Sequence, residues 1–156
     1  MRTISDIWDV AKSDGPLRLF SKGVRYTYNY SRWRVSKEYS LSLQDLNVKF
    51  SAPTYRAEKL NRSRFNSENT ILVDVLNNLG RSDVFCDVGA NTGLYTLFAA
   101  GACDQVISFE PYQPNVELLR KDISKNELSN VSLFDLALSD SAGAVPFDEP
   151  DKPDVG

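Results

Sequence analysis

The second half of the chain alternates between short apolar runs and amphipathic stretches. The apolar runs at 83–88, 106–109 and 131–138 have the length and composition of buried strands in a parallel sheet. Between them, apolar residues recur at helical spacing around 94–100 and from Pro114 onward. This order of strands and helices is that of right-handed parallel β/α units. The pattern therefore predicts an α/β fold of the Rossmann-like, doubly wound class.

Two further elements are expected around this unit. Ser67 is the predicted N-cap of a helix that Gly80 ends. Its apolar face consists of Ile71, Leu72, Val75, Leu76 and Leu79. After the third strand, Ala142 and Gly143 are expected to turn the chain into a short strand at 145–147.

The first 66 residues carry weaker periodicity. A short helix is expected at 5–10, and a longer one from Leu17 onward, where apolar and aromatic residues recur at helical spacing. Residues 39–56 alternate as a β-hairpin does, with 45–47 as the expected turn and Pro53 ending the second strand. The expected architecture is a helix-plus-hairpin extension at 1–66, followed at 67–156 by the first half of the α/β domain.

Charge follows the same division. Residues 1–66 hold 13 Lys or Arg against 6 Asp or Glu, whereas 67–156 hold 5 against 15. Such asymmetry indicates a basic segment joined to an acidic globular part.

The composition narrows the possible chemistry. In 156 residues, 42% are hydrophobic and 25% charged, as in ordinary globular proteins. No run is long and apolar enough to span a bilayer, and Cys86 and Cys103 have no disulfide or metal-site spacing. We expect Cys86 to be a buried hydrophobe and the compartment to be the cytoplasm. The chain has no histidine, which excludes a His-dependent triad or a zinc deaminase within it.

The candidate site lies after the first strand of the predicted sheet. The loop from Asp87 to Gly93 follows that strand at its carboxyl end, where open α/β sheets bind ligands. Its glycines, Gly89 and Gly93, allow a sharp turn and a close approach. Glu110 ends the second strand and is placed to accept the ribose hydroxyls of an adenosyl ligand. Asp87 is placed to meet a ligand ammonium.

The spacing of the glycines selects among adenosyl ligands. A dinucleotide fingerprint starting at Gly89 would need glycines at 91 and 94, where the chain has Asn91 and Leu94. A P-loop would need Gly-Lys-Ser/Thr, and no such phosphate cradle is present. An NAD-dependent dehydrogenase is therefore disfavoured. The predicted cofactor is S-adenosylmethionine, and no metal site is predicted.

Four linked motifs resemble the FkbM family of class I methyltransferases. They are the Asp87–Gly93 run, Phe109-Glu110-Pro111 with Pro114, Asn126–Asn130, and Ala137–Asp140 with Gly143. The resemblance covers about 68–147. It implies a class I methyltransferase fold that transfers methyl groups to oxygen atoms of sugars or natural products. The cofactor contacts it implies are Asp87, Gly89, Ala90, Asn91, Gly93 and Glu110, with Leu136 and Ala137 flanking the adenine.

The sequence departs from this family in one respect. The family continues with a fourth strand bearing a Lys-x-Asp-x-Glu-Gly-type motif and three further strands, and nothing like them occurs here. The expectation is either a fragment, inactive and poorly folded alone, or a non-catalytic remnant or interaction module that binds the cofactor weakly or not at all. No catalytic residue is identified, and the expected acceptor is a small molecule or glycan.

The segment 16–37 combines basic and aromatic residues without any acid. Such a segment can bind RNA or an anionic membrane. The preferred interpretation is a lid whose aromatic side chains pack on the domain, so neither nucleic acid nor membrane is an expected partner.

Overall fold

The computed structural model describes the backbone of residues 16–144 and the side chains of residues 23–144. The helix expected at 5–10 and the strand expected at 145–147 lie outside these residues. The structure divides into two compact units between Lys37 and Glu38.

The first unit contains the helix α2, Pro16–Ser36. It confirms the helix expected from Leu17 onward and is longer than the periodic stretch that predicted it. Thr27 and Ser36 each donate a side-chain hydrogen bond to the carbonyl oxygen four residues earlier. The helix ends where Lys37 adopts a φ of 56° and donates its N–H to the Trp33 carbonyl at 2.7 Å.

The second unit is built on a three-stranded parallel sheet. Its strands are β3 (Val84–Val88), β4 (Gln105–Phe109) and β5 (Val131–Phe134), in the order β3-β4-β5. The crossover helices are α4 (Leu94–Ala99) and α5 (Gln113–Lys125), the latter with the expected proline in its first turn. The predicted α/β class is confirmed. The third strand ends earlier than expected, at Phe134 instead of 138.

A hairpin and a long helix precede the sheet. The hairpin pairs β1 (Glu38–Leu43) with β2 (Leu46–Ser51). Its turn is the dipeptide at 44–45, shorter and earlier than the expected 45–47, because Leu46 pairs with Leu43 inside the ladder. Pro53 follows the second strand, as predicted.

The helix α3 spans Tyr55–Asn78, so the predicted start at Ser67 is wrong. Thr54 caps the helix instead, because its hydroxyl accepts the N–H of Ala57 at 3.0 Å. Ser67 lies inside the helix, where its hydroxyl donates to the Arg64 carbonyl. The expected boundary at residue 66 therefore falls within a continuous helix.

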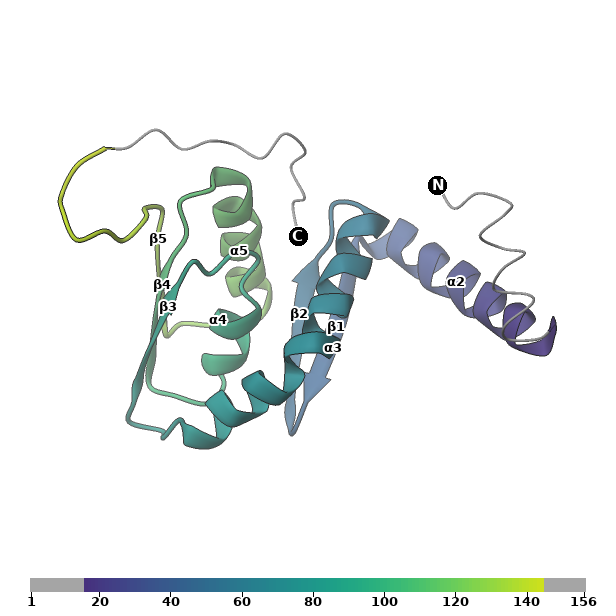
Figure 1. Ribbon diagram of the computed structural model, residues 1–156, viewed down its shortest axis with the longest axis horizontal. Coiled ribbons are helices and arrows are strands. Elements are labelled where there is room, and N and C mark those ends of the chain that lie inside the picture. The colour runs from purple at the N-terminus through teal and green to yellow at the C-terminus, as the bar shows by residue number, and fades with distance from the viewer. Residues whose placement is uncertain (1–15, 145–156) are drawn as a thin grey trace. The chain divides into compact units, whose positions relative to one another are not determined.

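The second unit has three layers, and α4 and α5 form the middle one (Figure 1). The three-stranded sheet lies on one side of these helices, and the hairpin with α3 lies on the other. Phe98 of α4 is fully buried at the centre. Its ring lies 6.4 Å from the Phe50 ring of β2 and 5.9 Å from the Phe65 ring of α3, between centroids. The hairpin thus shares one core with the α/β part.

Side chains of α5 pair with the outer edge of β2 as a neighbouring strand would. Both carboxylate oxygens of Asp122 lie 2.9 Å from the Ser51 nitrogen, whose N–H they accept. One turn later, the Asn126 side chain accepts the Lys49 N–H at 2.8 Å and donates to the Lys49 carbonyl at 2.7 Å. Lys125 completes the contact, bridging Asp122, Glu38 and the Ser51 hydroxyl. The hairpin is therefore held by hydrogen bonds as well as by apolar packing.

The other face of the three-stranded sheet has no helix on it among the described residues (Figure 1). Val84 is 55% exposed, Val88 61% and Phe134 45%. Cys86, expected to be buried, is exposed on this face, because alternate side chains of β3 point away from the helices. We call Val84, Cys86, Val88 and Phe134 the open face. No helix within the described residues is long and apolar enough to cross a membrane.

Candidate functional site

The site forms where the carboxyl ends of the three parallel strands meet. Val88 is in register with Phe109, and Phe109 with Phe134. Beyond that register the connecting loops are joined by backbone hydrogen bonds. The Phe109 carbonyl accepts the N–H groups of Gly89 and Ala90, and the Phe134 carbonyl accepts that of Glu110. The loop after β3 and the acid after β4 are therefore brought together, as the sequence predicted.

The loop between β3 and α4 is wound through three left-handed residues. Gly89, Asn91 and Gly93 have φ values of 78°, 54° and 84°. Gly93 also packs against α5, where a Cβ would collide with the Leu119 side chain. The N–H of Gly93 closes the turn onto the Ala90 carbonyl at 2.8 Å. Both glycines are thus required by backbone conformation, and the second also by packing.

Glu110 fixes the loop from the neighbouring strand. Its side chain is buried, and Oε2 accepts the Asn91 N–H at 2.7 Å. Oε1 accepts the Tyr112 N–H at 3.0 Å, with the Asn115 amide at 3.5 Å. An ionised carboxylate offers about four acceptor positions. Glu110 therefore has a structural role that sequence reasoning missed, and retains some capacity to accept a further donor.

Asp87 is the second acid of the site. It is half-buried at the end of β3, and its Oδ2 accepts the Thr96 hydroxyl at 2.5 Å. Thr96 also contacts the hydroxyl of Ser108 at 2.8 Å, and both of these residues are fully buried. Burial raises the pKa of Asp87 above its ordinary value, and the hydrogen bonds from Thr96 oppose that rise. A partly desolvated carboxylate of this kind favours a cationic partner.

The helix α3 supplies residues that the sequence reasoning did not place at the site. The Thr92 hydroxyl lies 3.5 Å from the Asn61 side-chain oxygen. Arg64 pairs with Glu68 at 2.9 Å and lines a small cavity beside Thr92 and Leu94. The positive charge of Arg64 also lowers the pKa of Asp87. The sequence feature that could have placed them is Thr54, which is a suitable N-cap. A helix that begins after Thr54 includes Asn61 and Arg64.

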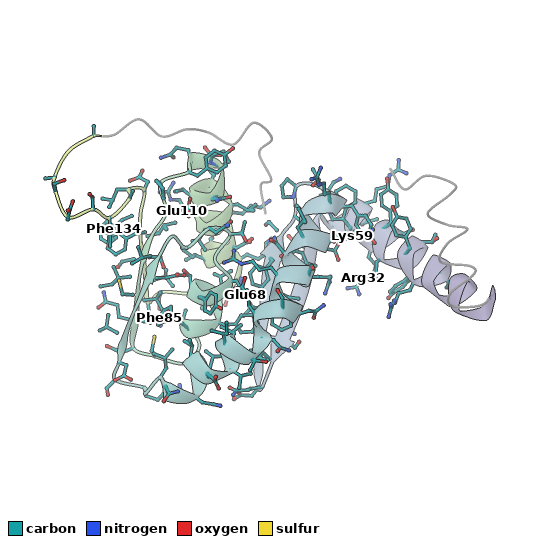
Figure 2. The ribbon with its side chains drawn as sticks, viewed as in Figure 1. Arg32, Lys59, Glu68, Phe85, Glu110 and Phe134 are labelled. Carbon is teal, nitrogen blue, oxygen red and sulfur yellow. The ribbon has the colours of Figure 1, made fainter. Side chains whose placement is uncertain are left out.

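The two residues proposed to flank the adenine lie beyond the end of β5. Leu136 is 43% exposed, and Ala137 is also exposed. They follow Phe134, whose ring stacks on Phe109 with centroids 5.3 Å apart. Figure 2 shows Phe134 and Glu110 toward the same end of the sheet, with Phe85 farther along it. The structure thus places Leu136 and Ala137 after the correct strand, and their contact with adenine stays a prediction.

Metal-binding side chains do not gather in the described part of the chain. Within residues 16–144 there is no group of three or more His, Cys, Asp or Glu residues that could hold a metal ion.

Several solved structures resemble this fold. An rRNA methylase from Streptococcus thermophilus matches 44% of this chain and 41% of its own, with 18% identity and a TM-score of 0.42. M. jannaschii TYW2, solved in complex with AdoMet, matches 65% of this chain and 43% of its own, with 19% identity and a TM-score of 0.41. A dimethyladenosine transferase from Plasmodium falciparum matches 49% of this chain and 28% of its own, with 15% identity and a TM-score of 0.43.

This chain accordingly spans less than half the length of each of these structures. No family model and no curated protein matches its sequence. The fold and the site therefore rest on the chain's own topology and contacts.

Proposed function

We propose that this chain binds S-adenosylmethionine and forms the cofactor-binding part of a methyltransferase. The observation that carries the proposal is the hydrogen bond from the Asn91 N–H to Glu110. It joins a glycine-containing loop after one parallel strand to an acid after the next. Ligands of open α/β sheets bind at this edge. An acid in this position suits the two hydroxyls of a ribose.

The charges around the loop suit the amino-acid end of this cofactor. The methionine moiety carries an ammonium and a carboxylate. Asp87 is an acid in a partly desolvated position and would meet the ammonium. Arg64 is 32% exposed beside the same loop and would meet the carboxylate. A dinucleotide would instead require recognition of phosphates, and the glycine spacing of this loop differs from the dinucleotide fingerprint.

The remaining assignments complete the cofactor site. Gly89, Ala90 and Gly93 would allow the backbone to lie close to the ligand, and Leu136 with Ala137 would flank the adenine. Methyl transfer is an in-line displacement at a carbon that the cofactor's sulfonium activates. The protein then contributes mainly alignment, with a base if the acceptor is a weakly acidic hydroxyl. We assign no base to this chain.

Membership of the FkbM family, with an oxygen acceptor on a sugar or natural product, is the finer proposal. Its support is the set of linked motifs from Asp87–Gly93 to Ala137–Asp140. Two of the solved structures reported above are named an rRNA methylase and a dimethyladenosine transferase, and neither name refers to a sugar or a natural product. The acceptor therefore has to be determined by assay.

A second candidate is an interaction module without methyltransferase activity. The observation that favours it is that the protein's own backbone already occupies both carboxylate oxygens of Glu110. On this hypothesis Glu110 only stabilises the loop, and the glycines only connect a strand to a helix.

Calorimetry distinguishes the two candidates. We expect the 156-residue chain to bind S-adenosylmethionine and S-adenosylhomocysteine but not NAD. Asp87→Asn and Arg64→Gln should each weaken binding about tenfold, as expected for the loss of a charged hydrogen bond. Glu117→Gln, an exposed acid on α5, is the matched control and should leave binding unchanged. Heat with NAD alone, or no heat with either adenosyl ligand, would reject the proposal.

A further inference from the structure

The segment that forms α2 carries several basic residues and no acidic residue of its own. Residues 16–37 contain six basic residues and no Asp or Glu. These are Arg18, Lys22, Arg25, Arg32, Arg34 and Lys37. The helix therefore has no acidic partner within its own length, and it forms part of a unit separate from the acidic half of the chain. A surface of this charge attracts a polyanion.

The helical period arranges aromatic rings on both sides of the arginines. Arg25 and Arg32 are seven residues apart and share one face of the helix. On one side of them lie Val24, Tyr28 and Val35. On the other side lie the aromatic residues Tyr26, Tyr30 and Trp33. We call Arg25, Arg32 and Tyr28 the α2 basic face.

The rings on α2 are accessible and partly organised. Tyr28 is 60% exposed, and the Arg32 guanidinium lies 5.7 Å from its ring centroid. Tyr26 is 49% exposed and stacks on Tyr30, with ring planes within 4° of parallel. Exposed rings beside guanidinium groups can stack on nucleobases while the cations contact phosphates.

We infer that α2 binds single-stranded nucleic acid through the α2 basic face. A single strand exposes both its phosphates and the faces of its bases. Its phosphates can therefore contact the arginines while its bases stack on the aromatic rings. This inference does not depend on cofactor binding or methyl transfer.

A membrane surface fits α2 less well. Helices that lie in a bilayer interface bury one face of large apolar side chains. In α2 the large aliphatic and phenylalanine side chains are Leu17, Leu19 and Phe20, near its start, and residues 23–36 contain no Leu, Ile, Phe or Met. The face that carries Val24 and Val35 also carries the hydroxyls of Thr27, Tyr28 and Ser31. Over residues 23–36, such a face offers little apolar area to acyl chains.

The test compares binding of labelled oligonucleotides and of vesicles by the full 156-residue chain. The probes are RNA and DNA oligonucleotides of about twelve nucleotides, and vesicles of phosphatidylcholine with about one third phosphatidylserine. Fluorescence anisotropy should show that the chain binds an oligonucleotide. In a sedimentation assay, the chain should not co-sediment with the vesicles. Comparing the RNA and DNA oligonucleotides then tells which nucleic acid binds more tightly.

Charge-reversed variants locate the surface. Arg25→Glu with Arg32→Glu should weaken oligonucleotide binding at least about tenfold. It should also reduce the dependence of log K on log salt by roughly 0.7 for each phosphate that the variant no longer neutralises. Arg120→Glu with Lys121→Glu changes the net charge equally on exposed positions of α5 and should leave binding unchanged.

A second variant pair tests stacking separately from charge. Tyr28→Ala should weaken binding roughly fivefold or more, and Tyr28→Phe should retain it. Alanine and phenylalanine are both tolerated within a helix. Circular dichroism should show that each variant keeps the helical content of the parent protein. The inference is overturned if the chain binds neither oligonucleotide, if it binds vesicles instead, or if the α5 control weakens binding as much as the α2 variant.

Discussion

Glu110 accepts the backbone N–H of Asn91 at 2.7 Å, and this bond joins the loop after β3 to the end of β4. Asn91 itself has a φ of 54°, in the left-handed region. The bond therefore holds the loop in a shape that its backbone does not favour without support. One acid thus fixes the loop, and the proposed function gives the same acid the ribose of the cofactor.

We expect Glu110→Ala to impair both roles. It should weaken S-adenosylhomocysteine binding at least about tenfold, because charged hydrogen bonds contribute about 1.5–3 kcal/mol each. It should also lower the free energy of unfolding by about 1–3 kcal/mol, because buried N–H groups lose their acceptor. Glu110→Gln keeps one acceptor oxygen and should have smaller effects on both. Calorimetry and urea unfolding measure the two effects. Unchanged binding in a destabilised Glu110→Ala variant would leave this acid only its structural role.

We expect Asp87 to make cofactor binding dependent on pH. Because burial raises its pKa, Asp87 of the free protein keeps its proton to a higher pH than an ordinary aspartate does. An ammonium group requires the ionised form. Affinity for S-adenosylhomocysteine should therefore fall as pH decreases through the raised pKa, and binding should release protons. In Asp87→Asn the affinity should be weaker at neutral pH and flat across the same interval. An identical pH profile in the two proteins would separate Asp87 from the cofactor.

The same pKa shift has a defined sign for stability. Asp87 holds its proton more tightly in the folded state than in the unfolded state. The resulting stabilisation is complete below the unfolded pKa and is lost as pH rises through the folded one. Asp87→Asn should therefore gain stability relative to the parent protein between acidic and neutral pH. Urea unfolding at several pH values measures this difference.

Alanine substitutions at Gly89 and Gly93 should distinguish the cost of backbone strain from the cost of a steric collision. Both have positive φ, but a Cβ at Gly89 would meet nothing within 4 Å, whereas one at Gly93 would strike Leu119. Gly89→Ala should cost about 1–2 kcal/mol in strain. Gly93→Ala should cost about 1–3 kcal/mol more, because it also overpacks the contact with α5. Leu119→Ala should rescue part of the Gly93→Ala defect. Equal losses at the two glycines would contradict the packing at Gly93.

The two cysteines report whether the open face is accessible in solution. Cys86 is exposed on that face, whereas Cys103 is buried and its pKa is raised by burial. In the native protein, an alkylating reagent should modify Cys86 rapidly and Cys103 only after unfolding. Mass spectrometry of the labelled peptides identifies the site. Protection of Cys86 that disappears on dilution would show that copies of the chain cover one another's open faces.

The parts of the structure that sequence predicted are those set by local pattern. Apolar runs marked the three strands, and the carboxyl ends of parallel strands necessarily coincide. Asp87, Gly93 and Glu110 could therefore be placed together without coordinates. Cys86 was misplaced because its burial depends on what covers the second face of the sheet, which periodicity along one strand does not show.

Arg64 and Asn61 were missed for a different reason. The stretch 55–66 has few apolar residues, so its helical period is weak, and the clearer periodicity after Ser67 suggested a later start. The observed start depends on the Thr54 cap and on packing of Phe65 against Phe98. Tertiary contacts of this kind override local signals.

The bonds from Asp122 and Asn126 to β2 have a consequence for the order in which this protein opens. A two-stranded hairpin alone is marginally stable, and amides on its outer edge normally exchange with solvent quickly. Here the Lys49 and Ser51 amides are donated to side chains of α5, so their release requires the hairpin to separate from that helix. Hydrogen exchange should therefore protect these two amides about as strongly as those within α5. The hairpin and the β/α core would then form a single foldon.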